Sequence, residues 1–332
     1  MNVTTLASFL AAALAFGVTA LTARRLIPWM QRRKLTRAPV RRREGEYITG
    51  QPAPVMGFLP LAAGLVAGVL PALVLLAVDT ETPGLLATEV SRLAGGALLA
   101  LGLGAVGLMD DYRHTRSLPG FSTLFLTLAA GAVGLCYLAA LILSGDYSTI
   151  LILPWLGQVD LGIWYHPLCL LLTVGMTMGS SQLDAADGAA PTASLTAGLA
   201  LGLAGGILGS NSAGVLGCAL GGLSLAILLY CLPPVKLRCG RGGSMLLGGG
   251  VMAAAMACGA PAFLLPAALP WLAEGIYALV RSCRLALTGR EMAPSLGVWL
   301  LERGWSDRWV ACFWMILSLL GLALTILAAG GI

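Results

Sequence analysis

The chain has 332 residues, of which 58% are hydrophobic and only 11% are charged, and it contains 44 glycines. This composition excludes an ordinary soluble domain and is typical of polytopic membrane proteins, in which glycine lets helices approach closely. The net charge of +5 indicates attraction to anionic lipids and argues against nucleic-acid binding. Because no linker is long enough to separate two units, we expect residues 1–332 to form a single integral membrane domain.

Ten apolar runs approach the roughly 20 residues that a helix needs to cross a bilayer. In chain order they cover 3–23, 55–78, 93–109, 121–143, 164–179, 191–208, 212–231, 243–259, 261–281 and 308–330. We therefore expect an all-α fold of about ten transmembrane helices. Segment 145–163 differs, because β-branched residues flank a Gly-Gln pair, and it predicts a short hairpin near 148–162.

The positive charges predict the orientation of these spans. If the N-terminus lies outside, 19 of the 20 Lys and Arg residues fall in cytoplasmic loops, since only Arg92 lies outside. Cytoplasmic loops carry such an excess of basic residues. We expect a multi-pass membrane protein with the hairpin external and the N-terminus outside.

Four aspartates lie just past apolar runs: Asp110, Asp111, Asp184 and Asp187. A charged residue at membrane depth costs roughly 2.5–3.5 kcal/mol unless it faces water, a partner or a ligand. The spacing of three puts Asp184 and Asp187 on one helical face. Each pair alone could simply end a span, but both pairs lie on the predicted cytoplasmic side. Together they indicate an acidic site suited to a divalent cation or to phosphate transfer.

A glycine-rich basic segment, residues 233–244, enters a predicted helix at Ser244. Backbone N–H groups and the positive end of a helix dipole at this point would suit an anion. The alternative is a flexible connector that carries positive charge for topology alone.

Glu274 lies inside the ninth run, where an acid is a functional hypothesis by default. A structural hydrogen bond to a neighbouring helix is the favoured alternative. The following loop, 282–307, predicts a short amphipathic helix around Val298–Arg303. A transporter whose intramembrane acids bind ions is a hypothesis of another class, and the sequence has none of the inverted repeats common in transporters.

These segments together resemble the polyprenyl-phosphate phosphosugar transferases, glycosyl transferase family 4, and in particular their phospho-N-acetylmuramoyl-pentapeptide transferase (MraY) type of peptidoglycan biosynthesis. Residues 110–112 fall on the LDDY motif of the family, and residues 184–188 on its NLTDGLDG motif. Residues 234–244 parallel PAKVFMGDTGS, residues 54–57 resemble PTMGG, and residues 292–294 match a late MAP segment. The order of these motifs makes the resemblance specific.

The resemblance implies a cytoplasmic cleft where Mg²⁺ helps undecaprenyl phosphate attack the β-phosphate of a UDP-sugar, releasing UMP. It implies catalytic roles for Asp110, Asp111, Asp184 and Asp187, with Asp111 and Asp187 as metal ligands. Phosphate-binding roles would fall on His114, Lys236, Arg241, Gly243 and Ser244. The implied partners are a polyprenyl phosphate, a UDP-sugar, and a second copy of the chain or an envelope-assembly protein.

Several positions depart from the family pattern. Arg241 stands where the family has a metal-ligating aspartate, and a guanidinium repels Mg²⁺ but pairs with phosphate. Ala190 replaces the second aspartate of DGLDG, His114 replaces a lysine, and residues 295–299 replace a histidine run. These changes favour a catalytically degenerate homologue that binds polyprenyl phosphate or a nucleotide-sugar. The alternative is an active phosphotransferase, and Mg²⁺ would be the cofactor of that active form only.

Overall fold

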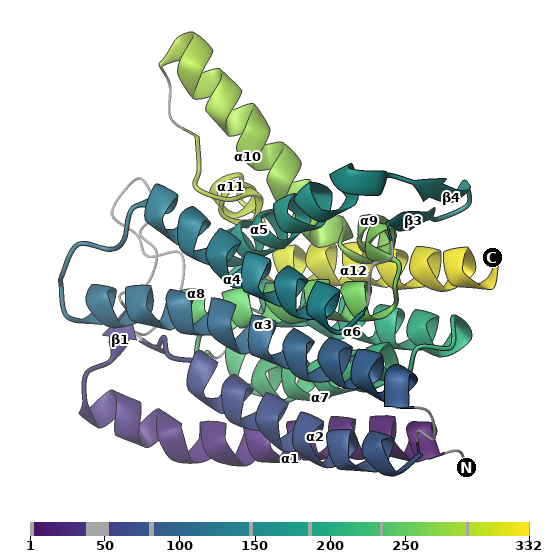
Figure 1. Ribbon diagram of the computed structural model, residues 1–332. Coiled ribbons are helices and arrows are strands. Elements are labelled where there is room, and N and C mark those ends of the chain that lie inside the picture. Colours follow the sequence, from purple (N-terminus) through teal and green to yellow (C-terminus); the bar gives the residue numbers. More distant parts are fainter. Residues whose placement is uncertain are drawn as a thin grey trace.

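The computed structural model of the protein describes residues 3–37, 53–79, 83–145, 149–184, 188–232, 235–289 and 292–331, and it consists mainly of long helices (Figure 1). The N-terminal half contains α1 (Val3–Arg32), β1 (Thr36–Arg37), β2 (Ala53–Pro54), α2 (Phe58–Asp79), α3 (Pro83–Thr115), α4 (Thr123–Leu143), β3 (Ile150–Leu153), β4 (Gly157–Asp160) and η1 (Gly162–Trp164). The C-terminal half contains α5 (Tyr165–Leu183), α6 (Ala189–Ile207), α7 (Asn211–Cys231), α8 (Gly240–Ala257), η2 (Pro261–Phe263), α9 (Leu264–Ala267), α10 (Leu269–Thr288), α11 (Leu296–Glu302) and α12 (Asp307–Gly330).

Within the described residues, seven helices are long and apolar enough to cross a membrane: α1, α2, α3, α4, α6, α7 and α12. The pair formed by Pro261–Ala267 and Leu269–Leu285, bent by 81°, would add an eighth span. Helices α5 and α8 occupy two further predicted ranges but are not among the seven. The protein is thus an all-α, multi-pass membrane protein, and the count of ten spans stays a prediction.

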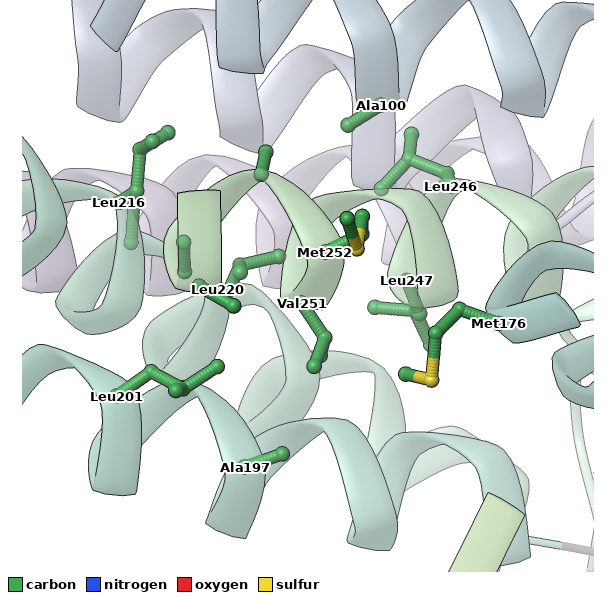
Figure 2. Packing of buried hydrophobic residues seen from close by; sticks show 14 of the residues in the cluster. Ala100, Met176, Ala197, Leu201, Leu216, Leu220, Leu246, Leu247, Val251 and Met252 are labelled. Atoms are coloured by element: carbon green, nitrogen blue, oxygen red, sulfur yellow. The ribbon is translucent and has the colours of Figure 1, made fainter. Parts of the chain in front are cut away.

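Helix α8 lies at the centre of the fold, in contact with α3, α5, α6 and α7. All its residues except Arg241 are buried. Figure 2 shows Leu246, Leu247, Val251 and Met252 of α8 among side chains of the surrounding helices. A helix enclosed on all sides needs no lipid-facing surface, so its many glycines are tolerated.

The predicted hairpin region contains two antiparallel strands, β3 and β4, with Leu153 opposite Gly157. The turn was expected at Gly157-Gln158, but those residues open β4, and the connection is formed by residues 154–156. Trp155 (φ 64°) and Gly157 (φ 94°) supply the left-handed backbone that this tight connection needs. Asp160 Oδ1 then accepts hydrogen bonds from Thr149 Oγ1 at 2.7 Å and from the Gly162 N–H at 2.9 Å.

Candidate functional site

The site forms where the last turns of α3 meet the first turn of α8. Gly107 on α3 makes this contact possible, because a Cβ there would lie 2.6 Å from the Arg241 carbonyl oxygen. Helix α3 therefore delivers Asp110 and Asp111, one turn later, to the start of α8. Both side chains are buried, at 1% and 3% exposure.

Asp111 caps the N-terminus of α8. Its Oδ1 accepts a hydrogen bond from the Arg241 N–H at 3.0 Å, and its Oδ2 accepts one from the Gly242 N–H at 2.7 Å. A carboxylate in this position satisfies unpaired N–H groups and complements the positive end of the helix dipole. Gly240, with φ 67°, permits the approach, because a Cβ there would come 2.0 Å from the Val55 carbonyl oxygen. Both oxygens of Asp111 thus accept bonds from the α8 backbone.

Asp110 forms an ion pair with the side chain of Arg241, and Nη1 lies 2.6 Å from Oδ2. Its other oxygen, Oδ1, accepts a hydrogen bond from the Phe121 N–H at 2.7 Å. His114 Nδ1 lies 3.3 Å from Oδ2 and 3.0 Å from the Asp110 carbonyl oxygen. A buried carboxylate needs such compensation, since an unpaired charge in the interior is strongly unfavourable. Arg241 supplies the positive charge that compensates it.

A cavity of about 480 Å³ opens beside this ion pair. Its lining contains eight polar side chains, of which four are charged: Arg238, Arg241, Arg281, Asp184, Ser181, Gln182, Thr123 and Ser295. Three guanidinium groups against one carboxylate give the lining a positive balance. Because guanidinium donors match phosphate oxygens in geometry as well as charge, this lining suits a phosphate-bearing ligand.

Three side chains of α10 fix the segment that closes one side of the cavity. Glu274, buried within α10, accepts hydrogen bonds from the N–H groups of Leu296 and Gly297 at 3.0 and 3.5 Å. Tyr277 Oη donates to the Ala293 carbonyl oxygen at 3.1 Å, and Arg281 donates to the Pro294 carbonyl oxygen. Glu274 therefore has the structural role favoured from the sequence, as the cap of α11, which overlaps the predicted amphipathic helix.

The other residues predicted for phosphate binding are placed differently. Lys236 is exposed and does not line the cavity, and its N–H donates to the Tyr230 carbonyl oxygen at 2.9 Å. Gly243 and Ser244 are buried, and Ser244 Oγ donates to the Arg241 carbonyl oxygen at 3.1 Å. The backbone N–H groups at this helix end were expected to bind an anion. Those of Arg241 and Gly242 instead donate hydrogen bonds to the Asp111 carboxylate. Of the basic segment, Arg238 and Arg241 reach the cavity.

Among the aspartates, Asp184 ends α5 and lines the cavity, whereas Asp187 lies outside the described residues. Across the part of the chain that the structure describes, no three His, Cys, Asp or Glu side chains gather in a way that could hold a metal ion. The bonds of Asp110 and Asp111 explain this for α3, because N–H and guanidinium donors surround both carboxylates. Both α3 carboxylates are therefore already bonded to N–H donors of the protein.

Sequence reasoning missed Arg281, Ser181 and Gln182 as cavity residues. A signal for Arg281 was present, since Glu274, Tyr277 and Arg281 follow the i, i+3, i+7 spacing of one helix face. All three side chains bond to residues 293–297. The positions of Ser181 and Gln182 depend on how α5 packs, which the local sequence does not reveal.

Comparison with known proteins gives the site its context. A sequence model of Glycosyl transferase family 4 matches residues 93–259, half of the chain. Similar proteins include the phospho-N-acetylmuramoyl-pentapeptide-transferase of Desulforudis audaxviator, 28% identical over 68% of this chain and 72% of its own length. Those of Clostridium perfringens and Clostridium botulinum are 25% and 24% identical, over 67% and 68% of this chain and 71% and 69% of their own lengths. The matched region includes both α3 aspartates and the start of α8, and the chain belongs to glycosyl transferase family 4.

Proposed function

We propose that this protein is a catalytically degenerate, MraY-like member of the family that binds a phosphate-bearing ligand in the arginine-lined cavity. The ligand is a polyprenyl phosphate or a nucleotide-sugar of cell-envelope metabolism, the substrate classes that the resemblance implies. The positive lining of the cavity supports this assignment. The protein would act in the bacterial inner membrane with its N-terminus outside and the cavity on the cytoplasmic face.

One observation carries the proposal: Arg241 Nη1 lies 2.6 Å from Asp110 Oδ2. In the motif that this segment resembles, an aspartate that binds the metal occupies the position of Arg241. A guanidinium at this position brings one positive charge and several directed N–H donors. It pairs with Asp110 as a metal ion would, and its remaining N–H donors can bind a phosphate. Magnesium-dependent transfer would lose both a ligand and the negative charge that attracts the ion.

The hydrogen bonds of Asp111 also support a protein that does not use a metal ion at this position. In phosphoryl transfer, metal ions neutralise the charge that develops on the phosphoryl oxygens. Asp111, the α3 carboxylate expected to hold the ion, accepts bonds from two backbone N–H groups. Its contribution is then to hold α8, and with it Arg241, against α3.

The test is a paired assay of turnover and binding on the purified full-length protein. With undecaprenyl phosphate and a panel of UDP-sugars, we expect no UMP release above the protein-free background, with or without Mg²⁺. UDP-sugar binding is measured as an increase in thermal stability, and it should persist without Mg²⁺. It should weaken by about tenfold in Arg281→Gln, as expected for one charge-assisted contact. Arg303→Gln, outside the cavity lining, is the matched control and should bind normally.

The alternative, an active transferase with altered metal handling, is favoured by the presence of Asp184 in the same cavity as the arginines. Asp184 would then orient the attacking phosphate or help to hold a cation, while Arg241 takes a phosphate. Under this alternative, UMP release should occur and should fall in Asp184→Asn. Such a result would overturn the degenerate assignment while leaving the binding role of the arginines in place.

A further inference from the structure

A second cavity, of about 500 Å³, is lined by residues of α1, α2 and α3 and of the short segments beside these helices. The residues that form most of its lining are Trp29, Leu35, Met56, Met109, Tyr112 and Phe121. We call this cavity the α1–α3 groove. It lies near β1, at the end of the molecule where α1 and α3 finish (Figure 1). Its size falls within the roughly 300–1,000 Å³ of ordinary ligand sites.

The groove is separate from the Asp110–Arg241 site because the two use different faces of α3. Met109, Tyr112 and Arg113 follow the i, i+3, i+4 spacing that brings side chains onto one face of a helix. Asp110 and Asp111, which bond to the start of α8, lie between them in sequence and point elsewhere. A ligand in the groove would therefore not contact the ion pair directly.

The lining of the groove is apolar and partly open to the surroundings. Leu35 and Met56 are buried and form its floor, at 6% and 4% exposure. Trp29, Met109 and Tyr112 are 45%, 59% and 47% exposed and form its sides. In a multi-pass membrane protein, an open apolar groove at a helix end is filled most naturally by a hydrocarbon chain of the bilayer.

Arginine side chains lie against the aromatic rings that line the groove. Three of its aromatic rings each carry an arginine over the face: Arg33 on Trp29 at 5.9 Å, Arg116 on Tyr112 at 5.5 Å and Arg113 on Phe121 at 4.5 Å. Aromatic side chains are enriched where a membrane meets water, and arginines at that level attract anionic headgroups. The occupant that fits both features has an acyl chain and a negatively charged head.

We infer that the α1–α3 groove binds one anionic phospholipid of the bilayer, with an acyl chain against Met109 and Tyr112 and its phosphate beside Arg33 and Arg116. The Phe121 N–H donates to Asp110 Oδ1 at 2.7 Å. A lipid in the groove, which Phe121 lines, would thus steady a residue that holds Asp110. The groove is a lipid site outside the cavity assigned to the phosphate-bearing ligand.

The test uses the full-length protein reconstituted into vesicles of phosphatidylglycerol and phosphatidylcholine in equal parts. After gentle extraction, native mass spectrometry counts the lipids that stay bound. We expect one retained phosphatidylglycerol in preference to phosphatidylcholine. In the double variant Arg33→Gln/Arg116→Gln, the ratio of retained phosphatidylglycerol to phosphatidylcholine should fall by about fivefold for each arginine removed. The double variant Arg303→Gln/Arg308→Gln, which changes two arginines elsewhere, should keep it.

A second variant tests the acyl-chain position independently of charge. Met109→Trp fills the groove and should release the retained lipid, whereas Leu128→Trp, at a similarly exposed position of α4 (65% against 59%), should not. Both changes are on exposed faces, so both proteins should fold. Retention of the two phospholipids in equal amounts would contradict the inference. So would unchanged retention in the groove variants, or retention only of an added polyprenyl phosphate.

Discussion

At the junction of α3 and α8, two buried carboxylates are compensated by hydrogen bonds and by one guanidinium. The Asp110 carboxylate is 1% exposed, and its bonds come from the Phe121 N–H and the guanidinium of Arg241. Asp111, also buried, receives two N–H groups of α8. The two neighbouring aspartates therefore have different tasks: Asp111 caps a helix, and Asp110 holds the side chain that points to the cavity.

Removal of the Arg241 side chain should leave Asp110 undercompensated. Because the Phe121 N–H bond remains and Arg241 is partly exposed, we expect Arg241→Ala to lower the free energy of unfolding by about 1.5–3 kcal/mol. Thermal unfolding in detergent measures the change. Asp110→Asn/Arg241→Ala removes the orphaned charge and should recover part of the loss, as a double-mutant cycle would reveal. A full, additive loss in the double variant would contradict a direct pairing.

Two glycines make a matched pair for testing the backbone at the start of α8. Gly240 has φ 67° and no room for a Cβ beside Val55. Gly240→Ala should cost at least about 1–2 kcal/mol from the left-handed conformation alone. Gly275 on α10 has an open position for a Cβ, so Gly275→Ala should stabilise the helix by up to about 1 kcal/mol. Thermal unfolding of both variants checks the opposite signs, and equal effects would refute the assigned conformation of Gly240.

At the scale of whole elements, α10 and α11 act as one unit. Figure 1 shows α10 projecting from the other helices with α11 beside its lower part. Glu274, Tyr277 and Arg281 connect α10 to residues 293–297 across the intervening loop. These bonds hold Pro294 and Ser295 in the lining of the cavity. The position of the lining thus depends on an acid inside α10 that does no chemistry itself.

Weakening this connection should loosen α11 without unfolding the protein. Glu274→Gln keeps the shape but leaves one oxygen in place of two, so one N–H of the α11 start loses its acceptor. We expect the local stability of residues 292–302 to fall by about 1 kcal/mol, which makes amide exchange there roughly fivefold faster. Hydrogen-exchange mass spectrometry measures it. Glu302→Gln, at the exposed end of α11, is the control, and equal exchange in both variants would contradict the capping role.

The sequence predicted the elements better than it predicted their contacts. Long apolar runs such as 121–143 gave α4 almost to the residue, because hydrophobicity and length are local properties. The motifs predicted a site that contains the aspartates and Arg241. Their pairing was not predicted, because Asp110 and Arg241 are 131 positions apart and meet only when α3 packs on α8. The hairpin turn shifted for a similar reason, since strand register decides which residues form it.

At the scale of the whole molecule, the arrangement of charge predicts how the protein sits in the membrane. The exposed Lys236 belongs to the basic side, and the exposed Gln158 of β4 belongs to the hairpin expected outside. In a variant without native cysteines, we expect Gln158→Cys to react with a membrane-impermeant maleimide in intact cells. Lys236→Cys should react only after permeabilisation. The reverse pattern would show that the positive-inside assignment is wrong for this chain.

We propose that a guanidinium takes the position of a metal ion at the junction of α3 and α8. The test is to measure Mn²⁺ binding by electron paramagnetic resonance in the wild-type protein and in Arg241→Asp. We predict that the wild type does not bind Mn²⁺ at this site and that Arg241→Asp, which restores a carboxylate beside Asp110 and Asp111, does. Stoichiometric Mn²⁺ binding by the wild type, abolished in Asp110→Asn, would show that a metal ion and not the guanidinium occupies this position.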